Sequence, residues 1–209
     1  NVKKDLLDLI NWIMDDGTSP YNDKLTLSSA YYELSKSHVT LKEFTKALSL
    51  IKKTQELNIF SFNTDKILYL KAIINLNLNQ NDEALKDFLI VKNNEDLREE
   101  VHCYIGECYY KIGKYEKSMS YFIDSLATNK DQYIRFKLGV CYFNTKIYDK
   151  AVHFFSEAID MKPTPAAHYN RALSLLKIND LPKAKEDLVI AARNDIQNSK
   201  KLLERIENR

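Results

Sequence analysis

The sequence predicts an all-α protein in which five helical hairpins follow one another and stack into an α-solenoid. Glycine and proline are scarce, with four of each in 209 residues, and hydrophobic residues make up 44% of the chain. Few helix breakers beside abundant Lys, Glu, Leu and Ala favour helices over a turn-rich β fold. Small residues also recur in pairs at a fixed spacing along the chain. Single hairpins cannot bury their apolar faces alone, so we expect them to stack.

The repeated units begin near residues 28, 65, 99, 132 and 165, at steps of about 34 residues. The eighth position of each unit is small, and it holds Ser35, Ala72, Gly106, Gly139 and Ala172. The twentieth position is also small, and it holds Ala47, Ala84, Ser118, Ala151 and Ala184. The twenty-fourth position is large and apolar, and it holds Ile51, Phe88, Phe122, Phe155 and Leu188. Small residues on facing helices let the two helices of a hairpin approach closely, and the large residue fills the space beside them.

Turn and cap residues agree with this division. Three residues that tolerate a left-handed backbone fall at the expected turn between two helices: Asn79, Gly113 and Asn179. Thr164 before Pro165 predicts a helix start with an N-cap and a first-turn proline. Thr40 and Glu43 have the spacing of a capping box, which predicts that the second helix of the first unit begins there.

The flanks of the repeats are also expected to be helical. Residues 1–27 are predicted to form an N-terminal helix, with an apolar stripe in residues 2–15, and then a loop over residues 16–23. The five units fill residues 28–195. Residues 196–209 are expected to form a capping helix whose outer face is polar, as the exposed end of a solenoid requires. The chain begins with Asn1 rather than Met, so we interpret it as a fragment.

The pattern over residues 28–197 resembles the tetratricopeptide repeat (TPR), a 34-residue helix–turn–helix unit. The match is clearest in residues 135–163, where Gly139, Tyr142, Ala151 and Pro163 stand at positions that the family favours. The first two units depart from it, with His38 and Asn75 at the eleventh position, where the family prefers a large apolar residue. The resemblance implies a right-handed solenoid with a concave groove lined by the first helix of each unit.

The resemblance also implies which side chains line that groove. It selects Tyr32, Lys36, Tyr69, Ile73, Tyr104, Glu107, Phe136, Lys137, Val140, Tyr169, Asn170, Leu173 and Lys177. Aromatic anchors beside a few polar groups suit recognition of a peptide or helix segment. The sequence therefore predicts a non-catalytic scaffold that binds a segment of another protein, whose acidic end would point toward Lys137 and Lys177. Three alternatives would leave the groove without a ligand. The aromatic residues could pack on one another, a terminal helix could fill the groove, or partners could bind at the edges or the convex face instead.

Several other kinds of site are not indicated. A net charge of +2 gives no broad basis for binding nucleic acid or an anionic membrane, and no apolar stretch approaches the ~20 residues that span a bilayer. The three cysteines, Cys103, Cys108 and Cys141, suit a reducing, cytoplasmic compartment and have no zinc-site spacing. No catalytic, metal or cofactor residues are proposed.

Other uses of the family stay open as alternatives. The chain could be a dedicated client or secretion chaperone, or the regulatory TPR part of a multidomain enzyme. It is not expected to hold the acidic tail of heat-shock proteins as a co-chaperone does, because Cys103 and Glu107 stand where that carboxylate clamp needs Lys and Asn. Any oligomeric state is compatible with the prediction, since solenoids can associate through their ends.

Overall fold

The structure is a computed structural model that describes residues 2–16, 20–57, 64–126 and 131–208. Within these residues the regular structure is helical throughout, with no strand, so the all-α prediction is confirmed. The helices are α1 (Val2–Asp16), α2 (Pro20–Thr40), α3 (Phe44–Glu56), α4 (Thr64–Asn77), α5 (Asn81–Val91), α6 (Arg98–Lys111), α7 (Tyr115–Leu126), α8 (Gln132–Asn144), α9 (Tyr148–Met161), α10 (Pro165–Lys177), α11 (Leu181–Arg193) and α12 (Ser199–Glu207). The chain forms two compact units, Asn1–Cys108 and Tyr109–Arg209, and each is described by itself.

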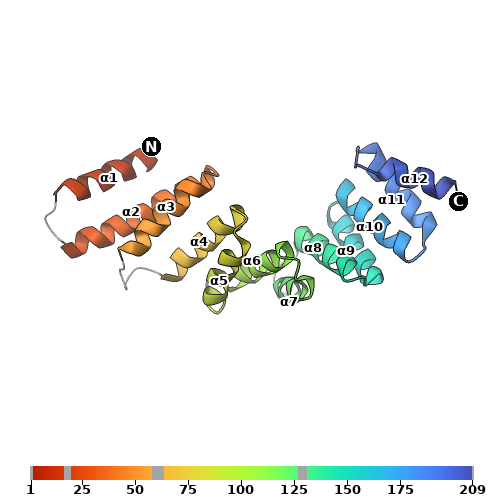
Figure 1. The fold of residues 1–209 in the computed structure, drawn as a ribbon, viewed down its shortest axis with the longest axis horizontal. Helices are drawn as coiled ribbons and strands as arrows, with labels where there is room; N and C mark the ends of the chain where they lie inside the picture. Colours follow the sequence, from red (N-terminus) through yellow and green to blue (C-terminus); the bar gives the residue numbers. More distant parts are fainter. Residues whose placement is uncertain (1, 17–19, 58–63, 127–130, 209) are drawn as a thin grey trace. The chain divides into compact units, whose positions relative to one another are not determined.

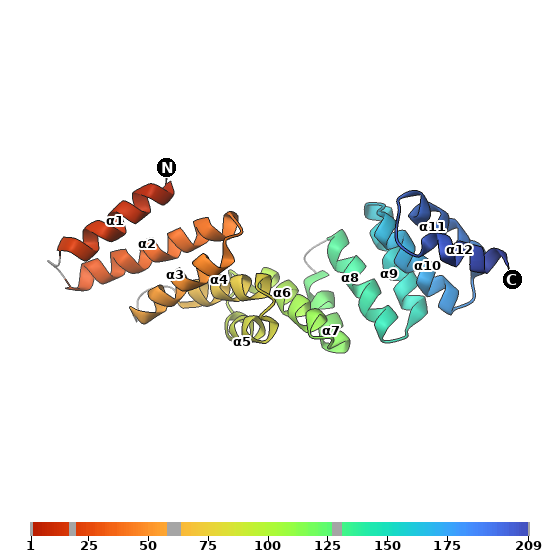
Figure 2. The same ribbon diagram turned by 45° about the horizontal axis from the view of Figure 1, so that its top comes forward.

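In the first unit, α2 pairs with α3 and α4 pairs with α5, each as a helical hairpin (Figure 1). The small residues of the first hairpin meet directly, because the hydroxyl of Ser35 donates a hydrogen bond to the carbonyl oxygen of Ala47 at 3.0 Å. Both residues are fully buried, as is the large apolar residue Ile51 that follows. Helix α1 lies beside α2 (Figure 2) and buries Ile10 in a cluster with Tyr31 and Leu34.

In the second unit, α8 pairs with α9 and α10 pairs with α11, and α9 also packs on α10. Gly139 on α8 and Ala151 on α9 are buried at the eighth and twentieth positions of their repeat, and the ring of Phe155 fills the space beside Gly139. Ala172 and Leu188 occupy equivalent buried places in the next hairpin. The close approach of paired small residues is thus seen in both units.

The turn between the helices of each hairpin uses a left-handed residue. Asn79, Gly113 and Asn179 have φ angles of 59°, 79° and 65°, as predicted. Lys42 and Lys146 adopt the same conformation, at 58° and 64°, although lysine rarely does so. The hairpin geometry therefore sets this turn whatever residue occupies it.

One predicted helix start is confirmed and another is wrong. The hydroxyl of Thr164 accepts a hydrogen bond from the backbone N–H of Ala167 at 3.2 Å, so Thr164 is the expected N-cap of α10. The capping box at Thr40 and Glu43 does not form. Thr40 is the last residue of α2, and its hydroxyl donates to the carbonyl oxygen of Ser37 at 2.7 Å.

The carboxylate of Glu43 interacts with other side chains instead of with the backbone N–H of Thr40, which a capping box would use. It accepts a hydrogen bond from the ammonium of Lys46 at 3.0 Å and lies 2.5 Å from the imidazole Nδ1 of His38. The ammonium of Lys3 on α1 lies 3.5 Å away. Hydrogen bonds between charged groups are stronger than those to a neutral donor, which explains why the capping geometry is not used.

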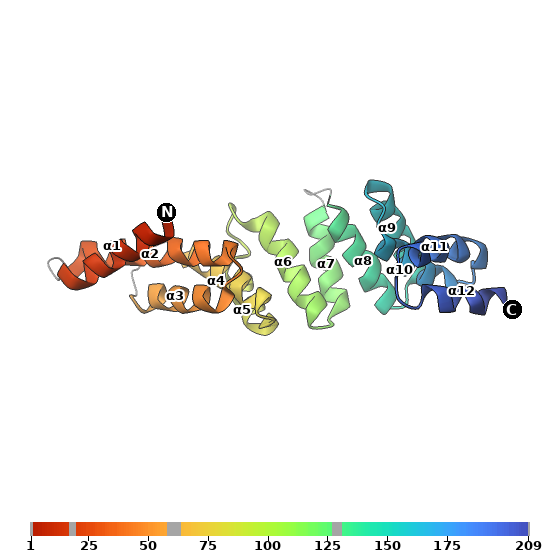
Figure 3. The same ribbon diagram turned by 90° about the horizontal axis from the view of Figure 1, so that it is seen from above.

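The flanking helices differ from their predicted bounds. Helix α1 covers the expected stripe, but α2 begins at Pro20, so residues 20–23 of the predicted loop are helical. Residues 17–19 of that loop lie outside the described residues. The C-terminal helix α12 begins at Ser199 rather than at residue 196, because Asn198 before it has a left-handed φ of 70°. Figure 3 shows α12 beside α11, on which it packs. The division into segments 1–27, 28–195 and 196–209 stays a prediction.

Candidate partner-binding face

The thirteen predicted groove residues all lie on the first helix of a hairpin. We call the exposed sides of these first helices, taken in each unit by itself, the first-helix face. In the first unit these residues are Tyr32 and Lys36 on α2, Tyr69 and Ile73 on α4, and Tyr104 and Glu107 on α6. None of the six is buried, although their neighbours Leu34 and Ile74 are almost fully so. Helix α2 contacts α4, so first helices of successive hairpins are neighbours.

Tyr69 and Tyr104 lie together and are partly used in packing. Their ring centroids are 6.1 Å apart, and the ring of Tyr104 stacks on the buried ring of Phe88 at 5.3 Å. The Tyr69 hydroxyl donates a hydrogen bond to the carboxylate of Glu100. Burial raises the pKa of both phenols, and the hydrogen bond to Glu100 raises that of Tyr69 further. These two rings therefore join three successive helices as well as presenting an accessible edge.

Tyr32 and Lys36 form a small charged cluster at the other end of this unit. The Lys36 ammonium lies 2.9 Å from the carboxylate of Glu33 and 5.5 Å from the centroid of the Tyr32 ring. The hydrogen bond to Glu33 raises the pKa of Lys36. This lysine already has an acidic partner on its own helix, so it offers little net attraction for a ligand.

In the second unit the first-helix face is made by α8 and α10, which contact one another. Its residues are Phe136, Lys137, Val140, Tyr169, Asn170, Leu173 and Lys177. None of them is buried. These seven side chains thus lie at the surface of two neighbouring helices, and their role in binding stays a prediction.

Some of these side chains have partners within the second unit. The ammonium of Lys137 lies 3.9 Å from the ring centroid of Tyr110 and 5.0 Å from that of Tyr133. A cation over an aromatic ring is attracted by the electron density of its face. The ring of Phe136 lies 5.7 Å from that of buried Phe155. The side-chain amide of Asn170 donates to the carbonyl oxygen of Ala166 at 2.8 Å, within its own helix.

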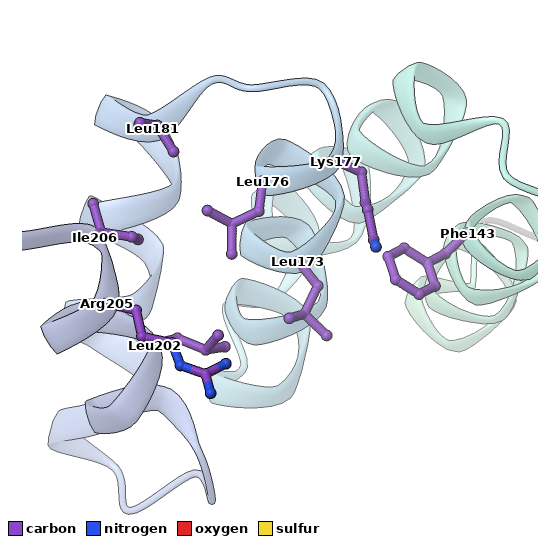
Figure 4. Close-up of a pocket in the computed structure, with 8 residues that line it drawn as sticks. All are labelled: Phe143, Leu173, Leu176, Lys177, Leu181, Leu202, Arg205 and Ile206. Carbon is purple, nitrogen blue, oxygen red and sulfur yellow. The ribbon is translucent and has the colours of Figure 1, made fainter. Parts of the chain in front are cut away.

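A cavity of about 310 Å³ adjoins this face at the end of the chain, and we call it the C-terminal pocket (Figure 4). Phe143, Leu173, Leu176, Lys177, Leu181, Leu202, Arg205 and Ile206 line it. Only Leu173 and Lys177 belong to the predicted set. The other contributors include Leu202, Arg205 and Ile206 of α12, a helix that was predicted only as the cap of the solenoid. Leu202, Arg205 and Ile206 have the i, i+3, i+4 spacing that puts them on one face of a helix, and this spacing is the signal that could have indicated a role in the site.

The described residues contain no group of His, Cys, Asp or Glu side chains arranged to hold a metal ion. Among them, no helix is long and apolar enough to cross a membrane. The buried imidazole of His168 and the guanidinium of Arg171 both bind the carboxylate of Asp187, at 2.7 and 2.8 Å. This network joins α10 to α11 in the hairpin core, so these three residues are explained by their role in holding the two helices together.

Comparison with known proteins identifies the repeats. The family model described as tetratricopeptide repeat matches residues 99–132 and 133–165. Residues 99–165 of this chain therefore carry two tetratricopeptide repeats. The matched segments begin within a residue of two of the predicted starts, 99 and 132. A comparison with curated proteins finds no match.

Solved TPR structures have the same fold. MamA from Desulfovibrio magneticus RS-1 aligns with a TM-score of 0.71 and 19% identity, covering 85% of this chain and 95% of that one. YrrB, a TPR protein with an unusual peptide-binding site, aligns with a TM-score of 0.69 and 20% identity, covering 86% and 91%. The C-terminal part of a TPR repeat-containing protein from Cytophaga hutchinsonii aligns with a TM-score of 0.69 and 17% identity, covering 92% and 74%. The chain therefore has the fold of these α-solenoid proteins, and the fold prediction is confirmed.

Proposed function

We propose that this TPR chain is a non-catalytic scaffold that binds a peptide or helix segment of a partner protein on its first-helix face. The observation that carries the proposal is the accessibility of that face. Its aromatic, aliphatic and cationic side chains are all partly or fully exposed, while the residues between them form the hairpin cores. An apolar surface with a few charged side chains is typical of protein surfaces that bind peptides.

The chemistry of the face suits an elongated ligand. Ile73, Val140 and Leu173 offer aliphatic surface, and Tyr32 and Tyr169 combine an apolar ring with a hydroxyl. Aromatic side chains of this kind are frequent among the residues that dominate binding energy. YrrB, which shares the fold, is described as having a peptide-binding site, and this is compatible with such a role here. The cysteines Cys103, Cys108 and Cys141 form no disulfide, and we place the chain in the cytoplasm because a reducing compartment keeps cysteines in that state.

The experiment is an affinity capture with the whole chain and two matched variants. The face variant carries Tyr32→Ser, Ile73→Glu, Val140→Glu and Tyr169→Ser, which avoids the ring cluster of Tyr69, Tyr104 and Phe88. The control variant carries Ile90→Glu and Ile190→Glu, two exposed apolar residues on the second helices of hairpins. Circular dichroism checks that both variants keep the helical content of the wild type.

The result expected is a partner that the control retains and the face variant loses. Chemical cross-linking between that partner and the chain would then map the bound segment to helices α2, α4, α8 or α10. A partner retained by the face variant and lost from the control would overturn the proposal, because recognition would then lie on the second helices.

A further inference from the structure

The C-terminal pocket differs from the other cavities of the second unit in the balance of its charges. Six of its eight residues are apolar, and the two charged ones, Lys177 and Arg205, are both cationic. None of the six apolar side chains is fully buried, so the walls of the cavity are accessible. No carboxylate lines it to balance the two cations.

The two cations also have no acidic partner elsewhere among the described residues. No ion pair of Lys177 or Arg205 is found there, whereas Lys183 pairs with Asp180 at 2.9 Å and Lys185 pairs with Glu207 at 2.8 Å. In Figure 4 the Lys177 side chain points toward Phe143, and Arg205 lies beside Leu202 on the other side of the cavity. The pocket therefore has a cation at each side of an apolar centre.

A second cavity of similar size shows the contrast. It measures about 320 Å³ between α9, α10 and α11, and its lining includes the acids Asp180 and Glu186 beside two cations. Those cations are neutralised, because Lys183 pairs with Asp180 and Arg171 pairs with buried Asp187. This second cavity attracts neither sign of charge strongly, so the two cations without an acidic partner distinguish the C-terminal pocket from it.

We infer that the C-terminal pocket binds a segment of a partner protein in which large apolar residues are flanked by acidic ones. The inference rests on the proposed function and names the partner chemistry at one end of the face. Leucine-like side chains would fill the space between Leu173, Leu176 and Leu202. Carboxylates on either side would approach Lys177 and the guanidinium of Arg205, whose planar fork matches a carboxylate.

The size of the pocket agrees with side chains as its occupants. At about 310 Å³ it is at the lower end of the roughly 300–1,000 Å³ found for ligand pockets. The apolar lining gives the energy of binding by removing apolar surface from water. The two cations give sign selectivity, since a basic ligand would place like charges together at the rim.

Three synthetic peptides test this selectivity, and they share one Gly/Ser host sequence. Their cores are Asp-Leu-Leu-Asp, Lys-Leu-Leu-Lys and Asp-Ser-Ser-Asp. Binding to the whole chain is followed by NMR of the isotope-labelled protein. The acidic–apolar peptide is expected to shift the resonances of pocket residues and to bind roughly tenfold more tightly than either of the others. Its affinity is expected to fall as salt is added, because rim charges are screened.

Charge reversal gives a second, independent test. The variant Lys177→Glu/Arg205→Glu should lose the acidic–apolar peptide and gain the Lys-Leu-Leu-Lys peptide. The control Lys162→Glu/Lys201→Glu changes the net charge equally at two exposed residues outside the pocket, and it should bind as the wild type does. Because both pocket residues are on the surface, the reversed variant is expected to keep its helical content, which circular dichroism checks.

Four outcomes would overturn the inference. These are equal affinity for the acidic and basic peptides, no binding of any peptide, no effect of charge reversal, or self-association of the chain that the reversed variant abolishes. The last would show that a second copy, not a partner, fills the pocket. Failure here leaves the affinity capture with the face variant unaffected, because that variant contains no pocket residue.

Discussion

The ring of Phe155 on α9 packs directly against the backbone of Gly139 on α8. A Cβ atom added to Gly139 would lie 2.6 Å from two carbon atoms of that ring. Neither residue has room to move freely, because both are buried in the hairpin core. The close approach of α8 and α9 thus depends on the absence of a side chain at this position.

Replacing Gly139 with Ala should therefore destabilise the second unit. Overpacking of a filled core costs about 1–3 kcal/mol, against which the better helix propensity of Ala regains roughly 1 kcal/mol. We expect a net loss in the free energy of unfolding, measured by urea denaturation with circular dichroism. Equal or greater stability of Gly139→Ala would show that the ring of Phe155 gives way.

The double variant Gly139→Ala/Phe155→Leu is the control for this prediction. The neighbouring hairpin combines Ala172 with Leu188 at the same two positions, and both are fully buried there. Leu in place of Phe155 should leave room for the new methyl group. The loss in the free energy of unfolding of the double variant should therefore be smaller than the sum of the losses of the two single variants. Additive losses would mean that the clash with the ring of Phe155 is not what destabilises Gly139→Ala.

At a left-handed turn residue, a substitution is expected to stabilise the protein rather than destabilise it. Lys146 has a φ angle of 64° in the turn between α8 and α9, where Gly113 serves in an equivalent turn. A left-handed conformation costs a residue with a side chain roughly 1–2 kcal/mol, and glycine avoids this cost. Lys146→Gly should raise the free energy of unfolding by about 0.5–1 kcal/mol, because the greater freedom of glycine in the unfolded chain offsets part of the gain.

Lys150→Gly is a suitable comparison for that variant. Lys150 is exposed within α9, where glycine costs about 1 kcal/mol relative to Ala, so the same substitution should there be destabilising. A loss of stability in both variants would show that the turn does not strain Lys146.

Most of the fold could be predicted from the sequence, because it follows from steric patterns that recur. The pair Ser35 and Ala47 was placed correctly by its spacing alone, and the structure joins the two by a hydrogen bond. The turns at Lys42 and Lys146 were missed, since the residue type gives no sign of a conformation that the hairpin imposes. The capping box at Thr40 failed because Glu43 has side-chain partners from α1, α2 and α3, which only the tertiary structure brings together.

The candidate face could be predicted only in part. Its residues were selected by their register, and all of them reach the surface. The mutual packing of Tyr69 and Tyr104 depends on how α4 and α6 stack, which register does not give. The C-terminal pocket depends on where α12 docks, so Arg205 and Ile206 were missed.

The cluster around Glu43 predicts a dependence of stability on pH. Hydrogen bonds from Lys46 and His38 hold the pKa of Glu43 at about 2, below its ordinary value of 4.5. A group whose pKa is lower in the folded state stabilises the fold above its unfolded pKa. This contribution is therefore present above about pH 4.5 and is lost as the pH falls toward 2.

The variant Glu43→Gln removes that contribution. Between pH 6 and pH 3 its free energy of unfolding should fall less than that of the wild type, measured by urea denaturation at each pH. Glu56→Gln, at an exposed carboxylate on α3, should follow the wild type more closely. A pH dependence in Glu43→Gln as steep as in the wild type would contradict the assignment.

The last prediction compares two ion pairs at the same positions of different repeats. Arg171 and Asp187 stand at the seventh and twenty-third positions of the last repeat, as Lys71 and Asp87 do in the second. Asp187 is buried and binds both Arg171 and His168, at 2.8 and 2.7 Å. Asp87 is paired with Lys71 alone among the described partners, at 3.1 Å, and burial raises its pKa.

Neutralising the two aspartates should therefore have unequal effects. Asp187→Asn leaves a partly buried guanidinium without its carboxylate, and breaking such a pair costs about 3 kcal/mol. Asp87→Asn should cost clearly less, because burial already disfavours the charge of Asp87 and the Lys71 ammonium reaches solvent. Urea denaturation of both variants measures the difference. Equal losses would mean that the pairs contribute alike, and that the additional bond to His168 adds nothing to the stability of the last hairpin.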